Sequence, residues 1–332
     1  MKRERFIATV VSAAGAAAVC SPLRAQEDPA ISSQTQALRV LLGTGRLQTI
    51  DAQTFLYDGR RYRGTATTLP NGQVVSTVPL EQYLYSVVSR EMPRSWPGEA
   101  LQAQAILART YVLQRSNPNR DYDVVTSEAD QVYTGIDAEA AQTNAAVNAT
   151  AGHVLRYRSE FATIAYFSCC GGHTESSAEA WGGKPLAYLS GVTCNYCKDS
   201  QWYQWTQTIG VDRLRTALGA QSGSVGDIQD IALDSPDASG RARFWMFTGT
   251  QGSARVKASD VRRAVGSRVL PSLLVRKVTL QSSGDAAATL EGGGLGHGVG
   301  FCQWGARGLA QTGANSTAIL AYYFPGTTVG SS

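Results

Sequence analysis

Apart from its first 25 residues, the sequence lacks a long apolar run, an excess of charge of one sign and an internal repeat. Because there is no second apolar run, no other segment is apolar enough to cross a membrane. Beyond residue 25, 26 basic side chains face 25 acidic ones, so the chain has no basic stripe of the kind that nucleic-acid binding requires. We therefore expect a globular protein that binds no nucleic acid and, once processed, no membrane.

The first 25 residues have the layout of a secretory signal peptide. Lys2, Arg3 and Arg5 precede the apolar run FIATVVSAAGAAAV, and LRA then ends at Ala25, a small residue that suits cleavage. The run of about 14 residues is too short to span a bilayer stably. The sequence predicts cleavage near Ala25 and export to the periplasm or cell-wall space. An uncleaved membrane tether is the alternative.

The remaining chain mixes strands and helices in irregular order, which is typical of an α+β fold. After a polar linker at residues 26–37, the segment 38–79 contains short, partly alternating apolar runs separated by Gly, Asp or Asn-Gly, which predict strands. Strands are also expected over 153–168 and 228–280. The sequence GGGLGHGVGFCQWGARGLAQTG predicts a glycine-rich loop entering a final helix. We expect a single domain over residues 38–328, in one or two lobes.

A pair of helices is predicted at the centre of the chain. Helical periodicity runs from Pro79 to residue 91 and again from about Pro97 to residue 114. Pro93 and Pro97 separate the two helices, because proline lacks the N–H group and disfavours helix in the residue before it.

Glu91 is the unusual residue of the first helix. It shares one face with Leu84, Val87 and Val88 at helical spacing. Burial on that face and the negative end of the helix dipole both favour the protonated form of a carboxyl group there. Such a group can protonate a leaving oxygen. The alternative is a carboxylate that swings outward and pairs with a neighbouring arginine.

These helices lie within a longer pattern that resembles the SpoIID/LytB family, named after stage II sporulation protein D. The pattern comprises PLEQYLYSVVSREMPRSWPGEALQAQAILARTYVL, YTG at 133–135, SCCGGHTESSAEAWGG at 168–183, GHGVGFCQWGARGLAQTG at 296–313 and YYFPGT at 322–327. Catalytic members of this family are peptidoglycan lytic transglycosylases. They cut glycan strands, preferably stripped of stem peptides, between N-acetylmuramic acid and N-acetylglucosamine. The resemblance places their catalytic glutamate at Glu91.

A lytic transglycosylase can use one carboxyl group where ordinary glycoside hydrolysis needs two. The C6 hydroxyl of the sugar attacks the anomeric carbon and yields a 1,6-anhydro end, so one residue can donate and accept the protons. We therefore expect no cofactor and no catalytic metal. A hydrolase that pairs Glu91 with Glu175 is one alternative. The other is a non-catalytic glycan-binding protein that stimulates a cell-wall amidase, as LytB-type relatives are thought to do.

Other residues within the resembling motifs are expected to bind the glycan. His297 lies between glycines that allow a close approach to a ligand, and Gln303 offers an amide to sugar hydroxyls. For His297 and Glu175, a hydrogen bond that only fixes a loop is the alternative role, and Arg109 is expected to orient Glu91 or a loop rather than to touch sugar. The predicted substrate-binding residues are Gln104, Arg109, Gln131, Tyr133, Thr174, Glu175, His297 and Gln303.

The chain departs from the family in its metal ligands. Some members bind zinc through Cys and His residues just before QVY, where this chain has Val125, Ala129 and Asp130. That zinc site is expected to be absent.

Five cysteines follow the predicted signal peptide: Cys169, Cys170, Cys194, Cys197 and Cys302. Export favours disulfides, and we expect one or two bridges joining Cys169 or Cys170 to Cys194 or Cys197, with Cys302 left free. Two adjacent cysteines in an extended segment point to opposite faces and should not reach the same partner. Free thiols are one alternative. A relocated zinc site is the other, because thiolates at C-x₂-C spacing suit tetrahedral zinc.

Overall fold

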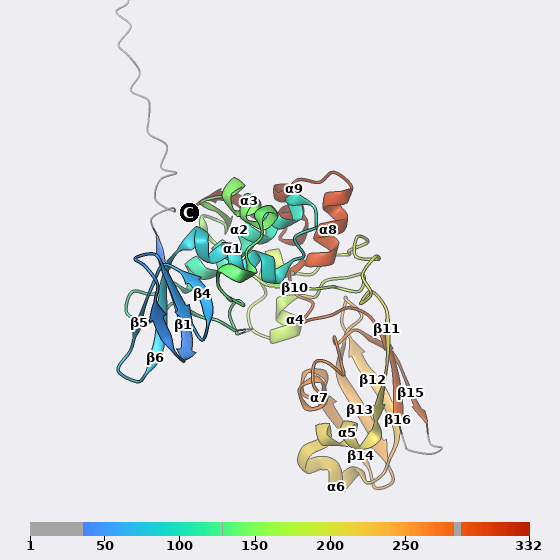
Figure 1. Cartoon of the computed structure of the whole chain (residues 1–332). Coiled ribbons are helices and arrows are strands. Elements are labelled where there is room, and N and C mark those ends of the chain that lie inside the picture. The colour runs from blue at the N-terminus through green and yellow to red at the C-terminus, as the bar shows by residue number, and fades with distance from the viewer. Residues whose placement is uncertain (1–35, 128, 282–286) are drawn as a thin grey trace, which may run out of the picture.

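The computed structural model describes residues 36–127, 129–281 and 287–332. The predicted signal peptide and nearly all of the predicted linker therefore lie outside the described residues. Small sheets and helices alternate irregularly along the chain (Figure 1), which confirms the α+β prediction. Within these described ranges, no helix combines the length and the apolar character needed to cross a bilayer.

The N-terminal part is the predicted group of short strands. These are β1 (Ala37–Thr44), β2 (Leu47–Thr49), β3 (Thr54–Tyr57), β4 (Arg60–Arg63), β5 (Thr65–Thr68) and β6 (Gln73–Pro79). One sheet has the order β5-β6-β1-β7, with β7 at Val124–Val125, and the other has the order β2-β3-β4. Alternate residues of β1 are buried in a core that also contains the apolar face of α1. The sequence did not predict β5, because its residues TATT are largely exposed and carry no apolar alternation.

Two packed helices lead from the strands into the central body. α1 (Leu80–Glu91) ends where Met92, the residue before Pro93, adopts an extended conformation with ψ of 143°. α2 (Gly98–Arg115) is mostly buried, and its many alanines allow neighbouring elements to approach closely. The elements packed around it are α1, α3 (Ala141–Ala149), β8 (His153–Tyr157), α8 (Gln303–Gln311) and α9 (Ser316–Tyr323).

The body is completed by short strands from distant parts of the sequence. β8 forms the predicted hairpin with β9 (Glu160–Phe161) and also pairs with β18 (Thr328–Ser331). β10 (Tyr166–Phe167) pairs in parallel with β17 (Phe301–Cys302), which leads directly into α8. Two helices of the body were not predicted. α4 (Ser177–Trp181) is too short to show a helical period, and α9 follows the helix that was expected to be the last.

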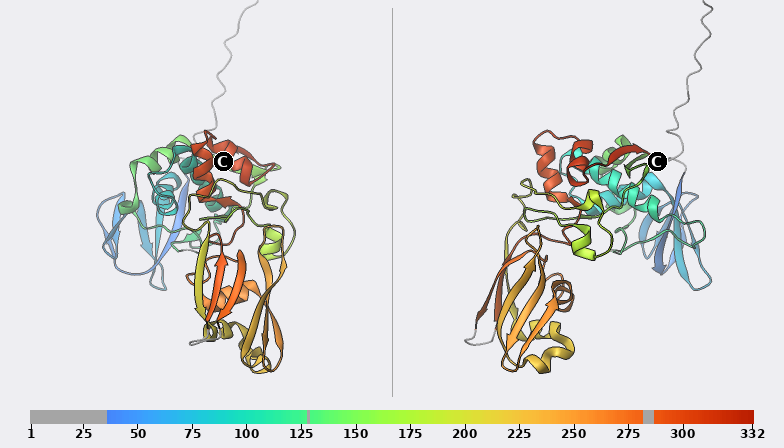
Figure 2. Two further views of the ribbon diagram at one scale, coloured as in Figure 1. Left: turned by 90° about the vertical axis from the view of Figure 1, so that its right-hand side faces the viewer. Right: turned by 180° about the vertical axis from the view of Figure 1, so that it is seen from behind.

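Residues 205–292 form an inserted lobe with a core of its own. Its elements are β11 (Trp205–Gly210), α5 (Val211–Arg215), α6 (Ser222–Val225), β12 (Ile228–Pro236), β13 (Ala242–Gly249), β14 (Ser253–Lys257), α7 (Ala258–Val265), β15 (Val275–Gln281) and β16 (Ala287–Gly292). The core is built around Trp245 and Phe247. Trp205 of the first strand pairs with Gly292 of the last, so the chain enters and leaves the lobe at one place. Figure 2 shows the lobe projecting from the body.

A buried ion pair fixes α1 against α2. The guanidinium of Arg109 is 0% exposed and donates two hydrogen bonds, of 2.9 and 2.6 Å, to the two carboxylate oxygens of Glu81. It also donates to the carbonyl oxygens of Val147 and His153, at the end of α3 and the start of β8. Because its side chain is enclosed, Arg109 does not bind substrate as predicted, whereas the expected role in orienting a loop fits its hydrogen bonds to the backbone on both sides of the connection between α3 and β8. Its guanidinium is enclosed by protein and holds the other end of α1.

Replacing Arg109 by methionine should lower the free energy of unfolding by about 3–5 kcal/mol, because it leaves the Glu81 carboxylate buried without its partner. Urea denaturation followed by circular dichroism measures the loss. Arg46→Met is a suitable control, since Arg46 is exposed and such surface changes stay within about 0.5 kcal/mol. A loss below about 1 kcal/mol in Arg109→Met would contradict this account of the pair.

Candidate active site

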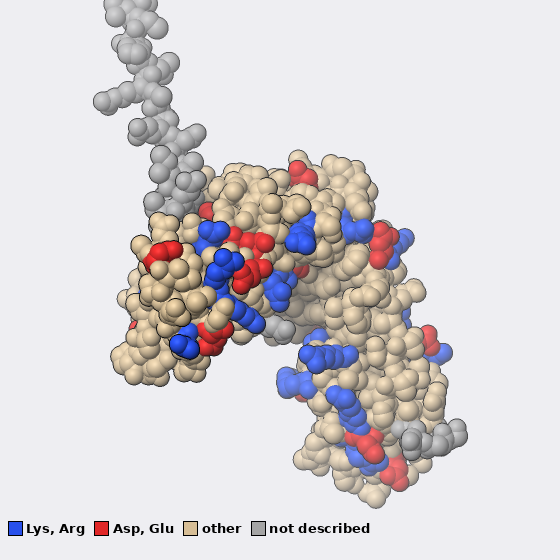
Figure 3. Space-filling model, in the orientation of Figure 1, with Lys and Arg blue, Asp and Glu red and all other residues tan. Residues whose placement is uncertain are grey.

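Glu91 lines a groove of about 610 Å³ on the body. Its other described walls are formed by Arg90 of α1, Tyr111 of α2, positions 129, 130 and 132, the segment 164–168 around β10, Trp181 of α4, and the pair His297 and Gln303. The walls thus combine segments more than 200 positions apart in the sequence, brought together by the pairing of β10 with β17. Figure 3 shows the hollowed surface between the upper body and the inserted lobe.

Two uncharged side chains contact the half-buried carboxylate of Glu91. Gln303, the first residue of α8, donates from Nε2 to Glu91 Oε2 at 3.3 Å. The hydroxyl of Tyr166 donates to Oε1 at 3.5 Å. Nε2 of Gln303 lies 3.4 Å from Oε1 of Gln104, which fixes the direction of the amide. The structure therefore brings the predicted Glu91 and Gln303 together, with Gln104 buried directly behind them.

A second layer of hydrogen bonds holds Tyr166 in place. Gln131 donates from Nε2 to the Tyr166 hydroxyl at 3.2 Å and accepts from the hydroxyl of Tyr83, also at 3.2 Å. Burial, and then the nearby charge of Glu91, raise the pKa of Tyr166, so its hydroxyl stays protonated and can donate. Gln131 is fully buried, so the prediction that it contacts the glycan does not fit. It positions a residue that does line the groove.

His297 lines the groove with its ring held by two backbone groups. Its Nδ1 accepts a hydrogen bond from the N–H of Val299 at 3.1 Å, so Nε2 carries the proton and donates to the carbonyl of Tyr166 at 3.0 Å. Burial lowers the pKa of His297 to about 4. Both ring nitrogens are occupied by the backbone, so this histidine fixes the loop at the groove wall.

The other carboxylate among the described residues of the groove is Asp130. Its oxygens accept from the hydroxyl of Tyr111, the guanidinium of Arg115 and the N–H of Val125, at 2.8–2.9 Å. Asp130 stands where some family members carry a zinc ligand. Here its oxygens are occupied by an ion pair, and Val125 offers no ligand atom, so the described residues do not fit zinc at that place.

Glu175 and Thr174 lie outside the described walls of the groove, so the structure does not bring these two predicted residues together with Glu91. Glu175 is 4% exposed and lies 3.4 Å from the guanidinium of Arg241. Burial and a hydrogen bond with Asp237 raise the pKa of Glu175 to about 8, although Arg241 opposes the shift. The hydroxyl of Thr174 exchanges hydrogen bonds with the backbone of Val192. Both residues fasten a loop.

Tyr133 is also a core residue rather than a glycan contact. It is 2% exposed and packs between Tyr62 and Tyr83, with ring centroids 5.4 and 4.9 Å away. Together with Arg109, it shows that several polar motif residues serve the fold around the groove.

The sequence analysis missed Tyr166 and Trp181 as residues of the site. Trp181 is 55% exposed, and its ring lies 5.6 Å from that of His297. Both rings also line a second hollow of about 440 Å³, whose far wall includes Arg262 and Arg263 of α7. The two hollows thus share a wall that joins the body to the inserted lobe. Trp181 could have been found as an aromatic residue beside two glycines in a loop motif. Tyr166 could not, because its sequence context is that of an ordinary strand residue.

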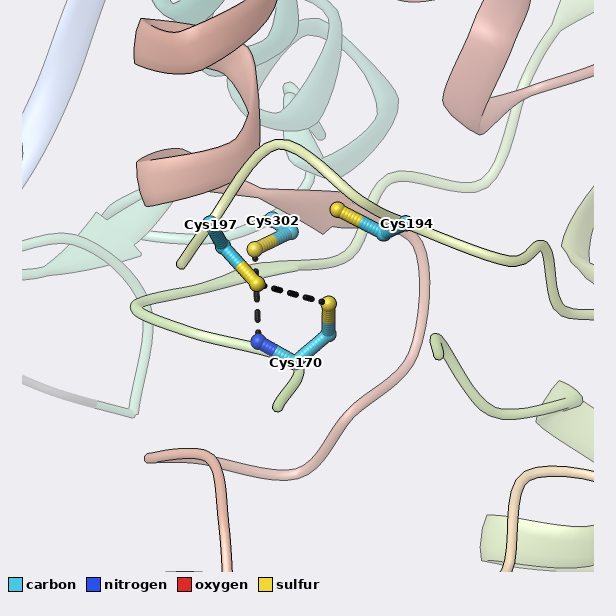
Figure 4. A group of neighbouring side chains, drawn as sticks. All are labelled: Cys170, Cys194, Cys197 and Cys302. Carbon is cyan, nitrogen blue, oxygen red and sulfur yellow. Dashed lines mark hydrogen bonds between the residues drawn. The ribbon is translucent and has the colours of Figure 1, made fainter. Parts of the chain in front are cut away.

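The cysteines depart from the expected pairing. The structure contains no disulfide among its five described cysteines, all of which are buried. The expected bridges from Cys169 or Cys170 to Cys194 or Cys197 are therefore absent, whereas Cys302 is free as predicted. Its sulfur lies among those of Cys170, Cys194 and Cys197 (Figure 4). Cys169 lies outside this group, but its thiol still interacts with those of Cys197 and Cys302. The expectation that the adjacent Cys169 and Cys170 do not reach the same partner is therefore wrong, because Cys170 interacts with both as well.

Comparisons with known proteins give the following relationships. The profile of the SpoIID family, described as stage II sporulation protein, matches residues 70–157. A domain of unknown function, DUF8618, matches residues 191–300. Stage II sporulation protein D of Bacillus amyloliquefaciens is 30% identical over 270 residues, which cover 76% of this chain and 74% of that protein.

Two further relatives extend this similarity. An uncharacterized protein of Brachyspira hyodysenteriae is 31% identical over 280 residues, covering 82% of this chain and 73% of that protein. An amidase enhancer of Bacillus subtilis is 29% identical over 294 residues, covering 74% of this chain but 40% of that longer protein.

The lowered pKa of His297 predicts a neutral ring at pH 6, with the proton on Nε2. This pKa lies below the ordinary value of 6.5, so between pH 6.5 and about 4 the unfolded state binds more protons at His297 than the folded state does. The contribution of His297 to stability is therefore lost as the pH falls through that range. Nitrogen–proton correlation spectra resolve its titration from those of the other two histidines. His297→Gln should remove this part of the pH dependence of stability, and His153→Gln should keep it. A ring that becomes charged near pH 6.5 would contradict the assignment.

Proposed function

The chain belongs to the SpoIID/LytB family, and from this premise we propose that it is a peptidoglycan lytic transglycosylase. The proposed substrate is a glycan strand stripped of its stem peptides, cleaved between N-acetylmuramic acid and N-acetylglucosamine. The observation that carries the proposal is the position of Glu91. This half-buried carboxyl group lies in a groove, contacted by the amide of Gln303 and the hydroxyl of Tyr166.

The proposed reaction uses Glu91 twice. Its protonated carboxyl group donates a proton to the glycosidic oxygen as the bond from that oxygen to the anomeric carbon breaks. The C6 hydroxyl of the same muramic acid residue then attacks the anomeric carbon and gives up its proton to the Glu91 carboxylate. The products are a 1,6-anhydro end and a free hydroxyl on the leaving sugar, and the carboxyl group is again protonated. Gln303 and Tyr166 keep the carboxyl group directed into the groove.

The surroundings of Glu91 favour this reaction over ordinary hydrolysis. A hydrolase needs a second carboxyl group as base or nucleophile. Glu175 is paired with Arg241 outside the described groove walls, and Asp130 is held by Tyr111 and Arg115. Neither of these two carboxylates is available to activate water beside Glu91.

The groove and the second hollow beside it together suit an anionic glycan. Each N-acetylmuramic acid of a stripped strand carries a free carboxylate, which an arginine can bind. Arg90 lines the first hollow, and Arg262 and Arg263 line the second, with Trp181 between them as a surface for a sugar ring. Figure 3 shows several basic side chains on the face of the inserted lobe turned toward the body. We further propose that the protein acts after export, as its N-terminal signal pattern indicates.

A second candidate function is a non-catalytic one. The similarity to an amidase enhancer favours a glycan-binding protein that stimulates a cell-wall amidase. In that case the groove would bind glycan strands without cutting them. The two functions differ in one product, since only a transglycosylase releases anhydro ends.

Glu91→Gln should lower the rate of cleavage of stripped glycan strands by about 10²–10⁴-fold, because an amide cannot transfer the proton. Mass spectrometry of the digest detects the 1,6-anhydro-N-acetylmuramic acid ends. Glu160→Gln makes the same change at an exposed position away from the groove and should keep full activity. Wild-type rates in Glu91→Gln would contradict the catalytic role. Wild-type protein that binds glycan but forms no anhydro ends would support the enhancer, and reducing ends would support a hydrolase.

Trp181→Ala should weaken glycan binding and raise KM by roughly 3- to 10-fold, with a small effect on kcat, because the ring provides a stacking surface away from the reacting bond. Trp181→Phe should recover most of the affinity. Steady-state kinetics on stripped strands separate the two parameters. An unchanged KM in Trp181→Ala would show that the ring does not contact substrate.

A further inference from the structure

Four buried cysteines from three separate segments meet behind the groove. Cys170 follows β10, Cys194 and Cys197 lie in the loop before the inserted lobe, and Cys302 ends β17. All four are buried, and their sulfur atoms lie within 4.8 Å of one another. Figure 4 shows the four side chains directed toward a common centre. We propose that these four thiolates bind one zinc ion, which ties both cysteine loops to the start of α8.

The spacing of the sulfurs matches a single tetrahedral ion. Zinc–sulfur bonds of about 2.3 Å place the sulfurs of a regular tetrahedron about 3.8 Å apart. The sulfurs of Cys170 and Cys197 are 3.4 Å apart, far beyond the length of a disulfide bond. An iron–sulfur cluster with four irons would need its four sulfur ligands spread around the whole cluster, each on a different iron. Sulfurs as close together as these leave room for one ion.

The surroundings of the sulfurs favour thiolates. The N–H groups of Cys170 and Gly305 donate to the sulfur of Cys302 at 3.3 and 3.4 Å, and the hydroxyl of Tyr323 lies 3.2 Å from the sulfur of Cys194. Hydrogen bonds of this kind orient metal ligands and stabilise their charge. Cys302 also occupies the N-terminal cap of α8, where the helix dipole favours a negative group.

Positive charge is available to offset that of a zinc tetrathiolate, which is doubly negative. Arg241 donates to the carbonyl of Cys170 at 3.1 Å, and Arg276 donates to the carbonyl of Gly171 at 2.9 Å. Both arginines come from the inserted lobe. The lobe therefore supplies the charge balance of a site whose ligands all belong to the body.

An ion at these cysteines would affect the groove, because one of its ligands is next to a groove residue in the chain. Cys302 is followed directly by Gln303, whose amide contacts Glu91. An ion bound to Cys302 would fix the first residue of α8 and thus the hydrogen-bond partner of the carboxyl group. This role is structural and does not depend on the proposed transglycosylase activity, because the site holds its ion whether or not the groove cleaves glycan.

Metal analysis of the purified wild-type protein tests the proposal directly. We expect about one zinc per chain, lost when an organomercurial reagent modifies the thiols. Replacing zinc by cobalt(II) should give the intense visible absorption of a tetrahedral cobalt tetrathiolate, with a titration that ends at one cobalt per chain. The cobalt experiment needs no mutation, so it remains informative where a cysteine variant fails to fold.

Cysteine variants identify the ligands. Cys197→Ser should reduce bound zinc to background and lower Tm. Cys169→Ser is the comparison at the buried neighbouring cysteine, whose thiol interacts with Cys197 and Cys302 but lies outside the group of four, and it should keep the zinc. Zinc-free protein whose mass shows two disulfides would overturn the proposal. So would iron in place of zinc, zinc that persists in a folded Cys197→Ser variant, or a cobalt spectrum without thiolate ligands.

Discussion

The buried ion pair between Arg109 and Glu81 is the interaction on which the rest of the body depends. A guanidinium with no exposure to water stays charged only if its donors are satisfied, and here a carboxylate and two backbone carbonyls accept from it. These partners come from α1, α3 and β8, so a single side chain of α2 sets the positions of three elements. Since Glu91 is the last residue of α1, the angle at which this pair holds the helix also determines where the catalytic candidate lies.

Local patterns in the sequence predicted the elements whose periodicity is strong. The strands of the N-terminal part, the pair α1 and α2, and the hairpin of β8 and β9 are all present. The position of Glu91 on an apolar face and its place in a groove also follow from spacing and resemblance. The residues that contact Glu91 could not be predicted. Gln303 contacts Glu91 across 212 positions of sequence, and that contact depends on the pairing of β10 with β17, which no short pattern encodes.

The wrong site predictions share one physical cause. Arg109, Gln131, Tyr133 and Glu175 are polar residues of recognisable motifs, and polar residues are usually expected at a surface or a ligand. In this fold their polar atoms are satisfied by protein partners, so they are buried instead. The grouping of the cysteines also depends on distant segments. Cys302 lies 132 positions from Cys170, so no local spacing predicted that its sulfur would join the other three.

The way the inserted lobe joins the body has an evolutionary consequence. Trp205 and Gly292 face each other in one antiparallel ladder, so the two ends of the lobe lie as close together as neighbouring strands. A descendant or ancestor that lacked the lobe could reconnect the body with a short turn, without moving α1, α2 or the groove wall around β10. The SpoIID profile matches residues 70–157 of the body, and the second matched domain covers residues 191–300, which comprise the lobe and the body segments at its two ends. Selection can therefore exchange or reshape the lobe as a module, and alter the far side of the groove, while the helix that carries Glu91 stays the same.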